Sequence, residues 1–172
     1  ILKLEALFHF SSYLPTHRPV RYASAFSGID LPLLALRKLF PLEHVAASDS
    51  SPHLRSALLS CHADLGLVPS RLHSDSSSSA AIQSAPADLF FAGSPCEAFS
   101  KRNRHRTPLS TARALLLLSW ALDYVRLHRP SVVLLENVET GEAMFSGISA
   151  VVSAIPGYIW HDVHLDPAVH CG

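Results

Sequence analysis

One cysteine stands where the sequence could place a nucleophile. Cys96 follows Gly93-Ser94-Pro95 and precedes a basic run that begins at Lys101. A lone cysteine is most often a small buried hydrophobe, but nearby cations stabilise the reactive thiolate of a cysteine in a loop. The run could also hold phosphates, or form only a solvated loop, and its cations are Lys101, Arg102, Arg104 and Arg106. Cys96 is therefore our candidate nucleophile.

An acid and an amide follow the apolar run at 132–135, which predicts a buried strand. A carboxylic acid at a buried strand end can be kept protonated and so donate a proton. Glu136 is therefore a candidate proton donor, with Asn137 beside it. As structure alone, Glu136 would end a strand and Asn137 would form a turn. Without Cys96 we would prefer that interpretation.

Three further positions could hold a cofactor. The turn Phe26-Ser27-Gly28-Ile29 contains a glycine that allows close approach of a ligand, although a simple tight turn is an equal alternative. Asp49 could accept hydrogen bonds from both hydroxyls of a ribose, or cap the helix expected to begin near Pro52. Asp75 could accept from an adenine amino group, but its serine-rich surroundings leave its register open. No Gly-x-Gly-x-x-Gly pattern is present, which argues against a dinucleotide-dependent dehydrogenase.

The elements that must position these residues alternate between strands and helices. Strands are expected at 21–26, 44–48, 87–92, 132–135 and 158–165, with a weak one near Arg71-Leu72. Helices are expected at 2–10, 31–40, 52–62, 111–126 (capped by Ser110 or Thr111) and 146–154, and a loop at 74–79. The alternation predicts an α/β fold with an open, mostly parallel sheet and helices on both faces. Ligands bind such sheets beyond the carboxyl ends of the strands, where the candidate residues lie.

Composition sets limits on the class of protein. The chain has 172 residues, 48% of them hydrophobic, which suits one globular α/β domain. A formal net charge of zero gives no global basic field, so any contact with nucleic acid must be local. The three cysteines are far apart, which argues against disulfides and structural zinc and favours a reducing, intracellular setting. We expect no metal and, because the apolar runs are short, no membrane span.

Taken together, these motifs resemble the cytosine-C5 DNA methyltransferase family. The resemblance covers about residues 22–172, and its specific parts are PC-x-x-FS and ENV in combination. It implies a Rossmann-like methyltransferase fold with S-adenosylmethionine as cofactor. The residues that would bind the cofactor are Phe26, Ser27, Gly28, Ile29, Asp49, Asp75 and Pro95.

The resemblance also implies a mechanism. Cys96 would add to C6 of a flipped-out cytosine, while Glu136, followed by Asn137, would hydrogen-bond the base. The basic run and Ser100 would contact the nucleic acid. DNA is the expected partner, although a branch of the family with the same motifs methylates tRNA. The expected location is intracellular, in the nucleus of a eukaryote or otherwise in the cytoplasm.

Four departures from the family pattern stand out. Asp30 replaces a glycine and would place a carboxylate near that of the cofactor, and Glu97 replaces a glutamine. The segment 110–117 keeps only Arg113 of an expected acid-plus-arginine motif. The chain ends where 168–172 resembles the approach to a Gln-x-Arg-x-Arg motif.

We therefore expect a fragment, since the chain begins with Ile1 and stops at Gly172. Residues 1–20 would form an N-terminal segment, and 21–172 the cofactor-binding and catalytic part without the target-recognition region. Such a piece would be inactive alone. The alternative is a non-catalytic scaffold or regulator of the same fold, but a scaffold has no chemical need for Cys96 or Glu136.

Overall fold

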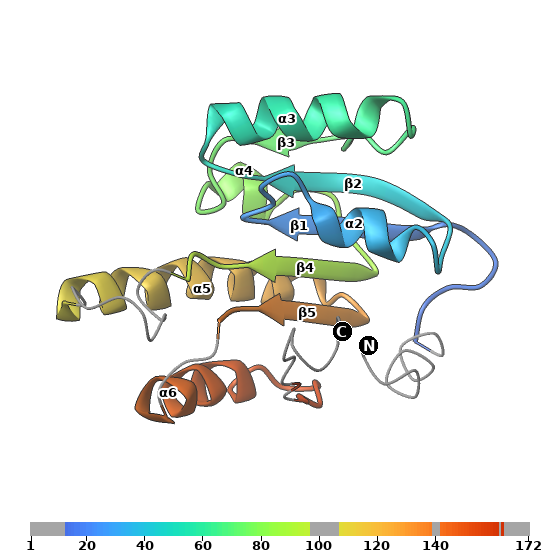
Figure 1. Ribbon diagram of the computed structural model, residues 1–172. Coiled ribbons are helices and arrows are strands. Elements are labelled where there is room, and N and C mark those ends of the chain that lie inside the picture. Colours follow the sequence, from blue (N-terminus) through green and yellow to red (C-terminus); the bar gives the residue numbers. More distant parts are fainter. Residues whose placement is uncertain (1–12, 97–106, 139–141, 162, 164–172) are drawn as a thin grey trace, which may run out of the picture.

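The computed structural model describes residues 13–96, 107–138, 142–161 and 163. A five-stranded sheet in the order β3-β2-β1-β4-β5 forms its centre, and all of its ladders are parallel (Figure 1). The strands are β1 (Val20–Ala25), β2 (Leu42–Ser48), β3 (Leu72–His73), β4 (Leu89–Gly93) and β5 (Val132–Glu136). The helices are α2 (Leu31–Leu36), α3 (Pro52–Ala63), α4 (Ser79–Ile82), α5 (Pro108–His128) and α6 (Glu142–Ser153). The predicted α/β fold is confirmed.

The two faces of the sheet have separate cores because side chains alternate along each strand. On one face, Phe90 of β4 is 2% exposed and stacks on Tyr124 of α5 with ring centroids 4.4 Å apart. That cluster also contains residues from α6. On the other face, Tyr22 of β1 and Leu33 of α2 are both fully buried in one cluster. Helices therefore cover both faces, as predicted.

The long helix α5 begins earlier than the sequence suggested. Its N-cap is Thr107, whose hydroxyl accepts a hydrogen bond from the Ser110 backbone N–H at 3.1 Å, while the Ser110 hydroxyl accepts from the Thr107 N–H at 3.1 Å. Pro108 follows the cap, where its missing N–H costs nothing. The prediction of a start at Thr111 with a cap at Ser110 or Thr111 was wrong, because Ser110 completes a capping box instead.

Three other predicted elements differ in extent. The helix expected at 31–40 ends at Leu36, and the loop expected at 74–79 ends at Ser78, whose hydroxyl caps α4 by accepting from Ala81 N–H at 3.1 Å. The helix expected at 146–154 runs from Glu142 to Ser153. The helix expected at 2–10 lies outside the described residues.

The strand expected at 158–165 is absent from the described part, 158–161 and 163. Its side chains do alternate between the interior and the surface, because Tyr158 and Trp160 pack against the core while Ile159 is 84% exposed. No sheet neighbour pairs with 158–161, and a strand needs a partner for its backbone groups. The prediction of a strand was therefore wrong for these residues.

An ion pair ties the N-terminal segment to the start of β4. The Asp88 carboxylate accepts from the Arg18 guanidinium at 2.6 and 2.8 Å and from the Arg21 backbone N–H at 2.9 Å. Burial alone would raise the pKa of Asp88, but these hydrogen bonds outweigh it and leave the pKa below its usual value. The pair lies at the amino end of β4, away from the edge where the candidate site lies.

Candidate active site

The carboxyl ends of β1, β2, β4 and β5 meet at one edge of the sheet, on the left in Figure 1. The strand order reverses between β1 and β4, and ligands of open α/β sheets bind beyond the strand ends at such a point. The turn after β1, Asp49 after β2, Cys96 after β4 and Glu136 at the end of β5 all lie at this edge. The structure thus brings four sequence-predicted groups to the expected place.

The turn after β1 has an unusual backbone. Phe26, Gly28 and Asp30 all have φ values between 53° and 54°, in the left-handed region. A Cβ built on Gly28 would meet nothing within 4 Å, so the space beside its backbone is open. Ser27 is 7% exposed and its hydroxyl bonds inward, so its side chain stabilises the turn. The open backbone at Gly28 is what close approach of a ligand requires.

Asp49 joins two loops. One carboxylate oxygen accepts from the Gly28 backbone N–H at 2.8 Å and the other from the Ser51 backbone N–H at 2.8 Å. The cap of α3 is Ser51, whose hydroxyl accepts from Leu54 N–H at 3.3 Å, so the alternative that Asp49 caps this helix was wrong. Each carboxylate oxygen can accept a second hydrogen bond. Asp49 is 8% exposed, and its contact with ribose hydroxyls stays a prediction.

Asp75 lies just beyond β3, whose His73 pairs with Ser48 of β2. Its carboxylate is exposed and accepts from the hydroxyl and the backbone N–H of Ser77, at 2.7 and 2.8 Å. These hydrogen bonds lower the pKa of Asp75, so the group is ionised at neutral pH and able to accept from a donor such as an amino group. Asp75 and Asp49 therefore follow neighbouring strands at the same end of the sheet.

The candidate nucleophile and the candidate proton donor lie at the ends of neighbouring strands. Gly93 of β4 is the register partner of Glu136 of β5, and a Cβ at Gly93 would lie 3.4 Å from Glu136 Oε2. Ser94 is buried, whereas Pro95 and Cys96 are exposed. Glu136 is also exposed, so the expectation of an acid buried at its strand end was wrong. Because β5 is the outermost strand of the described sheet, its carboxyl end is open to solvent on one side.

Asn137 connects these two strand ends. Its side-chain Nδ2 donates to Ser94 Oγ at 2.8 Å, and its Oδ1 accepts from the Val138 backbone N–H at 2.8 Å. Ser94 lies two residues before Cys96. Asn137 therefore links the Glu136 and Cys96 segments, and its assignment as a catalytic residue stays a prediction.

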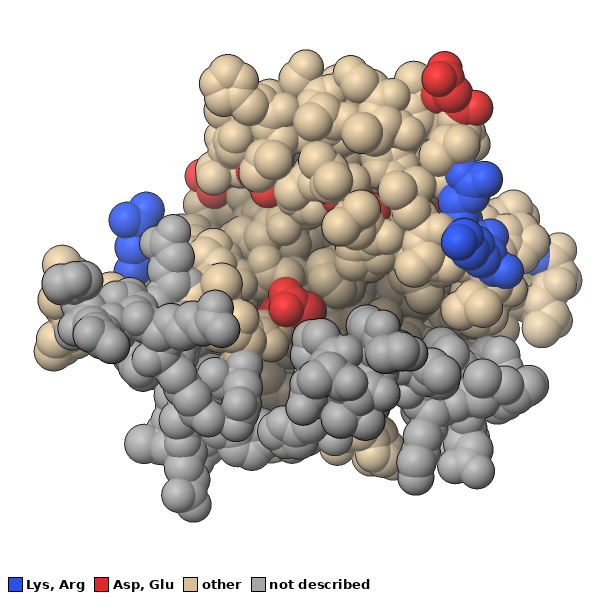
Figure 2. Space-filling view, in the orientation of Figure 1, with Lys and Arg blue, Asp and Glu red and all other residues tan. Residues whose placement is uncertain are grey.

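The predicted nucleic-acid contacts lie outside the described residues. They are Ser100, Lys101, Arg102, Arg104 and Arg106, and Glu97 lies there too. On the described surface in Figure 2, lysine and arginine side chains lie in separate places at either side. The basic run therefore stays a prediction.

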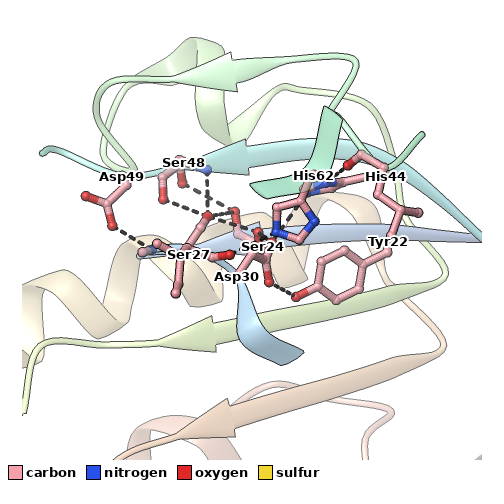
Figure 3. A network of polar contacts seen from close by, with 11 residues as sticks. Tyr22, Ser24, Ser27, Asp30, His44, Ser48, Asp49 and His62 are labelled. Atoms are coloured by element: carbon pink, nitrogen blue, oxygen red, sulfur yellow. Dashed lines mark hydrogen bonds and ion pairs between the residues drawn. The ribbon is translucent and has the colours of Figure 1, made fainter. Parts of the chain in front are cut away.

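Sequence reasoning missed a buried polar network beneath the turn (Figure 3). The Asp30 carboxylate is 1% exposed and accepts from the Tyr22 hydroxyl and the Ser24 hydroxyl, both at 2.6 Å. Asp30 therefore points into the protein, and the expectation that it stands near the cofactor's carboxylate was wrong. A signal was present in the sequence, because Tyr22 and Ser24 are polar and lie on the same face of a strand otherwise rich in alanine.

Within the described ranges, no cluster of three or more histidines, cysteines and acids could hold a metal ion. None of the helices that the structure describes has the length and apolar character to cross a bilayer. Cys61 and Cys96 are both free thiols.

Solved structures share this fold at low sequence identity. A ribosomal protein L11 methylase from Lactobacillus delbrueckii subsp. bulgaricus matches 87% of this chain and 65% of its own, with TM-score 0.51 and 17% identity. A SAM-dependent methyltransferase from Agrobacterium tumefaciens matches 84% of this chain and 47% of its own, with TM-score 0.53 and 13% identity. TrmN from Thermus thermophilus matches 84% and 39%, with TM-score 0.51 and 19% identity. The chain thus has a methyltransferase fold and spans less than two thirds of each of these structures.

No curated protein matches the sequence of this chain. A family model does match it: the model described as C-5 cytosine-specific DNA methylase covers residues 20–141. That stretch contains the turn after β1 together with Asp49, Asp75, Cys96 and Glu136. The chain therefore belongs to the C-5 cytosine-specific DNA methylase family.

Proposed function

We propose that the protein transfers a methyl group from S-adenosylmethionine to C5 of cytosine in DNA, with Cys96 as the nucleophile. One observation carries the proposal: an exposed thiol follows β4 at the sheet edge, and an exposed carboxylate, Glu136, ends the strand paired with β4. Family membership supports the reaction type. A scaffold of the same fold would need neither group.

The residues at the edge fit the cofactor. The open space beside Gly28 admits a ligand close to the backbone, and Asp49 retains acceptor capacity for ribose hydroxyls. Asp75, ionised and exposed, suits an adenine amino group. When bound, S-adenosylmethionine supplies an electrophilic methyl group. Phe26, Ile29 and Pro95 complete the proposed binding set.

Cys96 makes the base reactive. C5 of cytosine is a poor nucleophile, so the thiolate first adds to C6 while Glu136 donates a proton to the ring nitrogen N3. C5 then has enamine character and would take the methyl group, with the S–CH3 bond breaking and S-adenosylhomocysteine leaving. Loss of the C5 proton to a base lets the C6–S bond break, which returns the Cys96 thiolate, and the N3 proton returns to Glu136. The base must leave the duplex for this chemistry, because the stack shields its ring atoms.

DNA is the proposed partner because the matching family is described as a DNA methylase. The predicted basic run at 101–106 would hold its phosphates. If so, the protein acts where DNA is kept, in the nucleus of a eukaryote or otherwise in the cytoplasm.

The test is a covalent trap. We expect the full-length protein that contains this chain, given S-adenosylmethionine and duplex DNA that carries 5-fluorocytosine, to form a stable adduct through Cys96, because fluorine cannot leave C5 as a proton does. Denaturing electrophoresis and peptide mass spectrometry detect the adduct and its position. An RNA hairpin with the same base is the control for substrate class. An adduct with RNA alone would contradict the DNA assignment, and none with either would favour the scaffold.

Replacement of Asp49 by alanine is expected to weaken binding of S-adenosylhomocysteine about tenfold to a hundredfold. The variant loses the charge-assisted hydrogen bonding of the carboxylate to the ribose. A loss of about 1.5–3 kcal/mol, the contribution of one such bond, is about tenfold to a hundredfold in Kd. Titration calorimetry measures the Kd. Ser51→Ala is the matched control, because it removes the cap of α3 at a cost of about 1 kcal/mol in stability and keeps the Asp49 carboxylate. Unchanged affinity in Asp49→Ala would contradict the ribose assignment.

A further inference from the structure

The buried carboxylate of Asp30 lies on the interior side of the turn after β1. Asp30 stands at the start of α2, yet its side chain makes no hydrogen bond to that helix. Its two oxygens accept from Tyr22 and Ser24 of β1, and the ionisable group that it faces is His44 of β2, whose Nε2 lies 3.5 Å from Oδ2 (Figure 3). Burial lowers the pKa of His44, so this imidazole is uncharged at neutral pH and the 1% exposed Asp30 carboxylate has no cation beside it. A buried carboxylate of this kind is costly unless it is hydrogen-bonded.

The hydroxyl groups beside Asp30 connect it to the turn. Ser24 has a single proton, which goes to Asp30, and its oxygen lies 2.9 Å from the Ser27 hydroxyl. The Ser27 hydroxyl can donate to Ser24 or to the Ser48 carbonyl, which lies 3.0 Å away and also accepts from Ser27 N–H at 3.0 Å. Ser27 in turn accepts from the Ser48 backbone N–H at 3.1 Å. Asp30 therefore fixes the proton of Ser24, and Ser24 contacts the side chain that anchors the turn to β2.

This hydrogen-bond network reaches the residues proposed to bind the cofactor. Ser27 precedes Gly28, whose N–H donates to Asp49 at 2.8 Å. On the other side of Gly28, the Ile29 carbonyl oxygen lies 2.9 Å from His62 Nε2. Left-handed backbone at non-glycine residues is strained, so Phe26 and Asp30 need surrounding structure to hold them. The Asp30 network supplies that structure on the inner side of the turn.

We propose that Asp30 is a positioning residue that fixes the 26–30 turn in the shape that binds S-adenosylmethionine, acting through Ser24 and Ser27. The inference rests on the proposed function. Tyr22 supports the same arrangement: burial, and then the Asp30 charge, raise the pKa of its phenol well above the usual value, so it remains a donor.

The test compares variants of two acids, the buried Asp30 and the half-buried Asp88. In Asp30→Asn, an amide N–H₂ group meets a hydroxyl that needs an acceptor, so the KM for S-adenosylmethionine and the Kd for S-adenosylhomocysteine should rise about tenfold. The kcat at saturating cofactor should stay within about twofold, because Asp30 contacts no reacting atom. Asp88→Asn removes a half-buried, hydrogen-bonded acid at the amino end of β4, so it should lower thermal stability and leave both constants unchanged. Adding Tyr22→Phe to Asp30→Asn removes the conflicting hydroxyl and should restore part of the affinity.

Hydrogen exchange separates this inference from the proposed function. Asp30→Asn should speed exchange of the Ser27 and Gly28 amides about tenfold relative to amides of β4, and Asp88→Asn should not. Wild-type protein that binds no S-adenosylhomocysteine would overturn the proposed function, while the exchange rates would still decide whether Asp30 holds the turn. Unchanged affinity and unchanged exchange in Asp30→Asn would overturn the inference.

Discussion

Replacement of Cys96 by serine is expected to lower methyl transfer to cytosine at least a thousandfold. An alcohol is a far weaker nucleophile than a thiolate at neutral pH, and loss of a catalytic nucleophile costs about three orders of magnitude or more. Transfer of a labelled methyl group to a cytosine-containing duplex in a single turnover measures the loss. Because Cys96 is exposed, the free energy of unfolding should change by less than about 0.5 kcal/mol.

The chain offers a matched control for this substitution. Cys61 of α3 is the other exposed free thiol among the described residues, and it lies away from the strand ends that carry the site. Cys61→Ser should keep full activity, and Cys96→Ser should bind S-adenosylhomocysteine as tightly as the wild type. Activity that survived in Cys96→Ser would mean that this sulfur forms no bond to the base.

The sequence was most informative where one physical signal decided the structure. The run 132–135 and the segment 87–92 are almost wholly apolar, and each became a parallel strand whose bounds differ by one or two residues from the prediction. Parallel strands bring their carboxyl ends to one edge. The predicted grouping of Cys96, Glu136 and Asp49 at that edge follows from strand direction alone, before any side chain is considered.

The predicted helix ends were wrong where alternative local hydrogen-bonding arrangements compete. Thr107, Ser110 and Thr111 could each cap α5, and the pairing of Thr107 with Ser110 decided between them. In 31–40 the apolar spacing continues past Leu36, but the chain closes tighter turns there, with Leu39 N–H donating to the Leu36 carbonyl at 2.8 Å. These outcomes depend on short-range geometry that residue type does not specify.

The Asp30 network was missed for a different reason. Its members come from β1, β2 and the start of α2, so their contact depends on the packing of three elements. From the sequence alone, we expect the Asp30 carboxylate, which lies in a glycine-containing turn, to face the ligand. In the structure, the left-handed backbone at Asp30 turns it inward, where Tyr22 and Ser24 satisfy it. Asp30, which departs from the family pattern, is therefore accommodated by hydrogen bonds from Tyr22 and Ser24.

Replacement of Glu136 by glutamine is expected to slow methyl transfer about a hundredfold to ten-thousandfold, the usual contribution of a general acid. Glutamine keeps the size of the side chain and one acceptor oxygen, but it cannot give a proton to N3 of the base. Single-turnover transfer measures the rate, and the Kd for S-adenosylhomocysteine should not change. Glu43→Gln is the control, because Glu43 is an exposed glutamate near the opposite end of β2.

A second variant tests whether the position of the Glu136 carboxylate matters as well as its proton. In Gly93→Ala the new methyl group would lie 3.4 Å from Glu136 Oε2 and 3.4 Å from the Phe91 ring, at the limit of van der Waals contact, so it restricts the positions open to the carboxylate. We expect an intermediate loss of rate, about tenfold, since small displacements of a catalytic group are costly. If Gly93→Ala slowed transfer while Glu136→Gln did not, the acid would be irrelevant and the glycine alone would shape the pocket for the base.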